Sequence, residues 1–82
     1  MGKDIEKRQK AYSYIVNQAQ KLKLAETNLD GYISLEEIIN LKEGVADPSE
    51  VLIRQLKELF KHVSSEEEIY HNLIKPFEND KT

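Results

Sequence analysis

The 82-residue sequence contains no cysteine, no tryptophan and only one methionine, two prolines and three glycines. Without cysteine, neither a disulfide nor a thiolate zinc site can hold the chain together. No apolar run is long enough to span a membrane and no signal peptide is visible, so we expect a cytoplasmic protein. Charged residues make up 33% of the chain, which is typical of a soluble helical domain.

The length and the charge limit the possible functions. A chain of this size is expected to form one domain, residues 1–82. Such a domain buries only about 60% of its unfolded surface and is marginally stable unless an ion or a partner supports it. The net charge of −3 argues against nucleic acid as the main partner. The sequence contains neither a Ser-His-acid pattern nor a glycine-rich phosphate loop, so we expect no enzyme activity.

Apolar residues at helical spacing predict an all-α fold of four helices. The first is expected over residues 4–25, which contain no proline or glycine, with Asp4 as its N-cap. Its apolar positions are Ile5, Tyr12, Ile15, Val16, Ala19 and Leu22. A shorter helix follows over residues 35–43, and Gly44 is expected to end it in the left-handed conformation.

The second half of the chain carries two further helix starts. Asp47 is expected to cap the third helix, with Pro48 in its first turn, and this helix runs to about residue 62. The fourth is expected to begin at Ser64-Ser65 and to stop at Pro76.

Between the first two helices, residues 26–37 carry oxygen atoms at regular intervals. Gly31 allows a sharp turn in this stretch, and Ile33 is an apolar residue that can hold it against a core. Calcium prefers six to eight oxygen ligands, which a tight loop can supply from alternate positions. Among the oxygen-bearing side chains of this stretch are Asn28, Asp30, Ser34 and Glu37.

The run from Asn28 to Glu37 resembles the twelve-residue calcium loop of the EF-hand family. The resemblance implies a site for calcium, with magnesium as the alternative ion. The ligands that it implies are Glu26, Asn28, Asp30, the backbone carbonyl of Tyr32, Ser34 and Glu37. In such a site Glu37 would give both carboxylate oxygens, and Ser34 would act through water. One residue departs from the family pattern, because Glu26 stands where the family has aspartate. Glutamate is longer by one methylene and supports the tight loop less well.

EF-hands normally fold as pairs, and a weak internal repeat suggests a second, degenerate unit. The segment from Ile33 to Glu37 is matched thirty residues later by the segment from Val63 to Glu67. A second loop over residues 56–67 would lack metal ligands and supply only packing, with Ile33 and Val63 joined in a short antiparallel bridge. The alternative is that two helix starts merely have similar sequences.

A loop without metal is the alternative interpretation of residues 26–37. Asp30-Gly31 is a good turn in itself. Ser34 and Glu37 have the spacing of a capping box, in which Glu37 reaches back to the backbone at Ser34. This interpretation leaves Asn28 and Asp30 without a role.

Two functional hypotheses follow. In the first, the chain is a calcium-binding module whose ion regulates or stabilises a protein-interaction domain. In the second, it is a small helical protein-interaction module that needs no metal. Both predict a protein partner, which the sequence does not identify. The single methionine argues against the adaptable Met-rich groove of calmodulin-like sensors.

Overall fold

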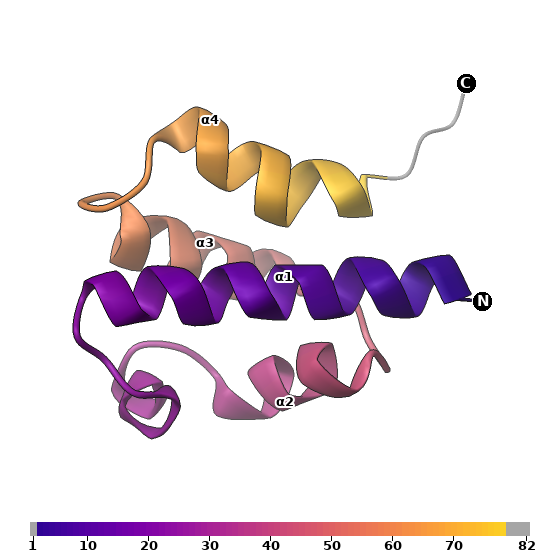
Figure 1. Ribbon diagram of the computed structural model, residues 1–82, viewed down its shortest axis with the longest axis horizontal. Helices are drawn as coiled ribbons and strands as arrows, with labels where there is room; N and C mark the ends of the chain where they lie inside the picture. The colour runs from indigo at the N-terminus through magenta and orange to yellow at the C-terminus, as the bar shows by residue number, and fades with distance from the viewer. Residues whose placement is uncertain (1, 79–82) are drawn as a thin grey trace.

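Four helices joined by short turns form the protein (Figure 1). The structure, a computed structural model, describes residues 2–78 apart from the side chains at positions 2, 3 and 26. No strand occurs among the described residues, which confirms the predicted all-α fold. In chain order the elements are α1 (Gly2–Lys21), the 3₁₀ helix η1 (Glu26–Gly31), α2 (Leu35–Glu43), α3 (Glu50–Phe60), α4 (Glu66–Ile69), the π-helical turn η2 (Tyr70–Ile74) and the 3₁₀ helix η3 (Lys75–Phe77).

Helix α1 is the central element of the fold. It runs between α2 and α4, and α3 lies behind it in Figure 1. It contacts α2, α3, η1 and η2, so elements from both halves of the chain pack against it. The shared apolar core consists of Ala11, Tyr14, Ile15, Ala19, Leu29, Ile33, Ile38, Leu41, Leu52, Leu56, Phe60, Ile69 and Leu73.

The buried face of α1 is centred on residues spaced four apart. Ala11, Ile15 and Ala19 are all buried, and this spacing places them on one side of a helix. Ile15 and Ala19 were predicted to be apolar contacts. Ile5 was also predicted on this face, but it is 43% exposed because it lies near the start of α1, beyond the core, and contacts the end of α2 at Gly44.

A buried polar network joins α1 to the connection between α3 and α4. The Tyr14 hydroxyl donates a hydrogen bond to Ser64 Oγ at 3.0 Å, and Ser64 donates to Gln18 Oε1 at 2.7 Å. All three side chains are buried, and burial raises the pKa of Tyr14. Ser64 was expected at the start of the fourth helix, but the side chain that caps α4 is Ser65, which accepts from the Glu68 amide.

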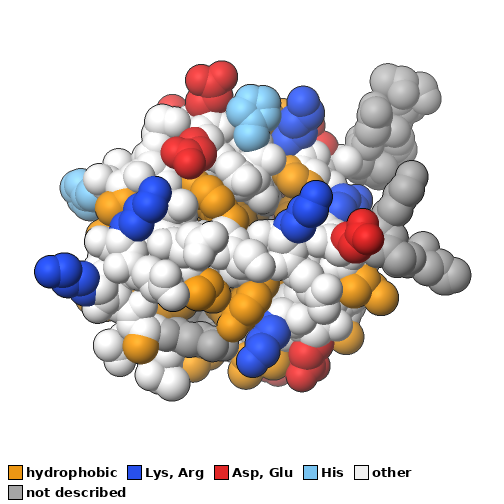
Figure 2. Space-filling view, in the orientation of Figure 1, with side chains coloured by type: hydrophobic (Ala, Val, Ile, Leu, Met, Phe, Trp, Pro, Cys, Tyr) orange, Lys and Arg blue, Asp and Glu red, His pale blue; other side chains and the backbone are white. Residues whose placement is uncertain are grey.

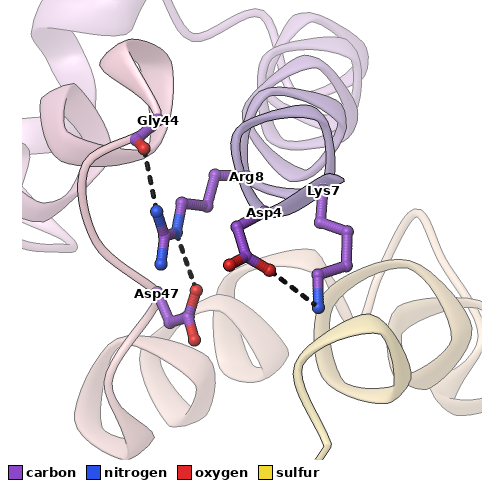
Figure 3. A network of polar contacts seen from close by, with 5 residues as sticks. All are labelled: Asp4, Lys7, Arg8, Gly44 and Asp47. Atoms are coloured by element: carbon purple, nitrogen blue, oxygen red, sulfur yellow. Dashed lines mark hydrogen bonds and ion pairs between the residues drawn. The ribbon is translucent and has the colours of Figure 1, made fainter. Parts of the chain in front are cut away.

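The beginning of α3 also differs from the prediction. Ser49 is its N-cap and accepts a hydrogen bond from the Leu52 amide. Asp47, the predicted cap, instead accepts from Arg8 Nε at 2.8 Å, while Arg8 Nη1 donates to the Gly44 carbonyl at 2.9 Å (Figure 3). Asp47 does not cap α3 because Arg8 of α1 takes its carboxylate. On the same helix, Asp4 and Lys7 form a second, longer ion pair.

The ends of the second and fourth helices show how the chain turns. Gly44 has φ of 72°, as predicted for the residue that ends α2. Pro76 was expected to stop the fourth helix, but the chain continues through η2 and η3 as far as Phe77. Proline lacks an N–H group, and the change from α-helix to π and 3₁₀ turns accommodates it.

Helix α1 ends four residues earlier than expected, at Lys21 rather than at Ala25. Lys23 adopts the left-handed conformation with φ of 62°. The Leu24 amide then donates back to the Ala19 carbonyl at 2.9 Å, which is the hydrogen bond of a Schellman motif. This turn directs the chain away from α1 and into η1.

We predict that Lys23→Gly stabilises the protein by about 1 kcal/mol, because a left-handed backbone costs a residue with a Cβ about that much. Lys21→Gly is the matched control. Lys21 is also exposed but lies in the helix, where glycine costs roughly 0.5–1 kcal/mol. Urea unfolding of both variants measures the difference. A lower stability for Lys23→Gly would contradict the proposed role of this turn.

Candidate functional site

Residues 26–31, the first half of the predicted calcium loop, are wound into the 3₁₀ helix η1. Leu29, in the middle of this helix, is fully buried, and Ile33 is only 3% exposed. The Leu29 carbonyl accepts from the amides of Tyr32 and Ile33 at 2.8 and 2.9 Å. Ile33 therefore holds the loop against the core as predicted, and Leu29 adds a second anchor.

Most of the predicted metal ligands lie at the surface of the loop. Asn28, Asp30, Tyr32 and Ser34 are exposed, and the side chain of Glu26 lies outside the described residues. Among the side chains that are described, no three of the types His, Cys, Asp or Glu are grouped so as to hold a metal ion.

Glu37, the predicted bidentate ligand, binds the start of α3. Its Oε1 accepts from the Ser49 amide at 3.1 Å, and its Oε2 accepts from the Ser49 hydroxyl at 2.9 Å. Ser49 Oγ in turn accepts from the Leu52 amide at 3.1 Å. The carboxylate thus supports the N-cap of α3, where a negative charge is favourable. Glu37 does not form the predicted capping box, and Ser34 makes no side-chain cap bond.

Gly31 does not make the sharp turn expected of it. Its φ lies outside the left-handed region, and a Cβ added there would meet no atom within 4 Å. The chain turns instead through the 3₁₀ helix, which any residue can enter. Gly31 thus lacks the backbone expected of the sixth loop position, and both oxygens of Glu37 accept hydrogen bonds from Ser49.

The predicted second loop is largely helical. Leu56 and Phe60, its first and fifth positions, lie in α3 and are fully buried. Only residues 61–65 separate α3 from α4. Ile33 and Val63 form no bridge, since neither belongs to a strand. The similarity between the two segments therefore reflects two helix starts, and the hydrophobic face of α3 extends through residues that were read as a loop.

An apolar groove is the main hollow beside this loop. It lies between the end of α1, Tyr32 and the outer side of α3, and its volume is about 650 Å³. Tyr32 and Val51, both in its wall, are 55% and 56% exposed. Exposed apolar side chains that gather in one hollow are typical of contact surfaces. The groove is lined by Leu22, Leu24, Tyr32, Val51, Arg54, Gln55, Glu58, Leu59 and His62.

The groove also contains an unsatisfied hydrogen-bond acceptor. Gln55 Oε1 is buried and has no hydrogen-bond partner. A buried polar atom without a partner costs roughly 1–3 kcal/mol. Rotation of the Gln55 amide toward a donor on a groove partner would recover part of this cost.

The sequence alone identified neither Leu29 as an anchor of the loop nor the residues of the groove. Leu29 was passed over because it stands between candidate ligands, yet it precedes Ile33 by four residues, which is helical spacing. Val51 is apolar but lies outside the buried stripe of α3, which Leu52, Leu56 and Phe60 form. The groove itself depends on how the end of α1 and the loop meet α3, and no local pattern contains that information.

Figure 2 shows how charged and hydrophobic side chains are distributed on one face of the molecule. Basic and acidic side chains are spread singly over this face, with hydrophobic side chains between them. In the part of the chain that the structure describes, no helix has the length and apolar character needed to cross a membrane.

Comparison with known proteins found no matching family model, no matching curated protein and no matching solved structure. The likeness to the EF-hand family therefore rests on the residues from Asn28 to Glu37 alone.

We predict that Gly31→Ala leaves the free energy of unfolding unchanged or raises it by up to about 1 kcal/mol, because alanine fits a helical backbone and restricts the unfolded chain. Gly44→Ala is the matched control. It places a Cβ 2.7 Å from Ile5 on a left-handed backbone, so it should destabilise by about 1–3 kcal/mol. Thermal unfolding compares the two. A large loss for Gly31→Ala would restore the metal-type turn at Gly31.

We also predict that Glu37 and Ser49 are energetically coupled. Ser49→Ala should cost about 1 kcal/mol, the usual value for an N-cap, and Glu37→Gln somewhat less, because the amide oxygen can still accept from the Ser49 backbone. Because both changes break the same contact, the double variant should lose less than the sum, by about 0.5–1 kcal/mol. Chemical unfolding in chelator measures all four proteins. Strict additivity would show that the contact contributes nothing.

Proposed function

We propose that this protein is a small helical protein-interaction module that works without bound metal. Its contact surface is the groove between the end of α1, Tyr32 and α3. The observation that carries the proposal is that this exposed apolar groove stands beside a loop that the chain's own side chains already hold in place.

The first support comes from how the loop is fixed. Leu29 and Ile33, four residues apart, both anchor the loop in the core. Burying one leucine side chain is worth about 1.5–3 kcal/mol. An ion bound at a hundred times its Kd would contribute about 2.7 kcal/mol. The apolar anchors are therefore sufficient in magnitude to replace an ion.

The second support comes from the groove itself. Tyr32 and Val51 each leave more than half of their surface in water, whereas many other large hydrophobic side chains of the chain are buried. Gln55 adds a buried acceptor that lacks a donor. An apolar wall with one unmet hydrogen bond suits a helical segment of a protein, which can fill the length of the groove with side chains.

Calcium binding stays a prediction from the sequence, which a titration can decide. We expect chelator-treated protein to give no heat with calcium or magnesium in calorimetry, and to keep its melting temperature at about millimolar calcium. A bound ion would instead raise the melting temperature by several degrees in a domain of this size. Such a rise, lost in the Glu37→Gln variant, would overturn the metal-independent proposal in favour of a calcium-binding module.

The interaction surface is tested with a displayed library of helical peptides. We expect selected peptides to bind equally well in calcium and in chelator, and to lose at least about tenfold in affinity to the Val51→Glu variant. Glutamate is favourable in the first turn of a helix, so this variant should fold.

Ile39→Glu is the matched control, because Ile39 is also an exposed apolar side chain but lies on α2 outside the groove. Equal loss of peptide binding by both variants, or binding that requires calcium, would contradict the proposed surface.

A further inference from the structure

Building on the proposed function, we propose that the partner in the groove is a second copy of this chain. The two copies pack through the outer sides of their α3 helices, which run antiparallel about a two-fold axis. Such a contact is isologous: if residue i of one copy meets residue j of the other, then residue j of the first copy also meets residue i of the second. The surface must therefore be complementary to itself, and α3 meets that requirement in charge, in hydrogen bonding and in apolar character.

The charges on α3 are self-complementary. Arg54 and Glu58 both line the groove, are exposed and lie one turn apart on the same helix. Arg54 has no ionic partner within the described residues. Glu58 pairs with Lys61 through Oε1 alone, in a contact that is open to water, and such a pair is worth little. Across an axis midway between the two positions, Arg54 of each copy faces Glu58 of the other.

The unpartnered acceptor lies close to the same axis. Gln55 is one position from the midpoint between Arg54 and Glu58, so the Gln55 side chains of the two copies flank the axis. A glutamine amide has both a donor and an acceptor. When the two side chains turn toward the axis, each amide can donate to the other, and this turn takes the Oε1 of Gln55 out of the buried position in which it has no partner.

The apolar part of the surface extends the contact along the groove. Val51 on α3 and Tyr32 beside it are exposed apolar side chains of the same wall. A stable dimer buries about 800 Å² from each copy. That is roughly a seventh of the 5516 Å² surface of this chain.

The test is a charge-swap series followed by sedimentation analysis up to about millimolar protein. The wild type should dimerise. Arg54→Glu and Glu58→Arg should each weaken the homodimer by about tenfold or more, because two ion pairs become two like-charge contacts. An equimolar mixture of these two variants should form a heterodimer, since every contact is then between opposite charges. The double variant should dimerise like the wild type.

Lys10→Glu is the control, because it changes the net charge by the same amount as Arg54→Glu at an exposed site of α1 away from the groove. It should leave the dimer unchanged. Circular dichroism on each variant shows that the helices are intact. The proposal is overturned by a wild type that stays monomeric at about millimolar concentration, or by a dimer that Arg54→Glu and Glu58→Arg do not weaken.

The same variants separate this inference from the proposed function. If the wild type is monomeric but helical peptides still bind in a manner that depends on Val51, the groove is an interaction surface for a different protein and only the self-association fails. If neither dimer nor peptide binding depends on Val51 or Arg54, both fail.

Discussion

The contact between Glu37 and Ser49 links the loop, α2 and α3, and the arrangement of the middle of the chain depends on it. One carboxylate accepts from both the amide and the hydroxyl of Ser49. Ser49 then accepts from Leu52 and caps α3. The start of α3 is consequently fixed by a side chain of α2, so the outer side of α3 and the groove beside it keep a defined position relative to the loop.

This contact and the anchoring of the loop are consistent with each other. A carboxylate whose two oxygens both accept hydrogen bonds from a helix start has to break them before it can bind an ion with both. The loop does not require that exchange, because Leu29 and Ile33 already fix it in the core. The same twelve residues thus keep much of a calcium-loop sequence while the chain holds them through apolar burial and a helix cap.

Much of the fold could be predicted from local patterns, and the candidate site largely could not. The four helices follow from apolar spacing and from the rarity of helix breakers, and the left-handed Gly44 follows from its place after α2. Asp47 was misassigned as a cap because its true partner, Arg8, is 39 residues away. The contact of Glu37 with Ser49 could not be predicted for the same reason, since Ser49 lies twelve residues away at the N-cap of α3. Patterns within a few residues identify what a side chain can do, whereas long-range packing decides which of its options is used.

The marginal size of the chain connects these observations to the groove. Eighty-two residues without a disulfide must divide their apolar side chains between a core and any contact surface. Here α1 receives α2, α3 and η2 on different sides, and α3 commits Leu52, Leu56 and Phe60 to that core. The opposite side of α3 cannot be covered by α1, which already lies on the other side, nor by the loop, which Leu29 holds in place. Within the part of the chain that the structure describes, the groove therefore stays open because the elements that might close it are already engaged, and Tyr32 and Val51 remain exposed for a partner.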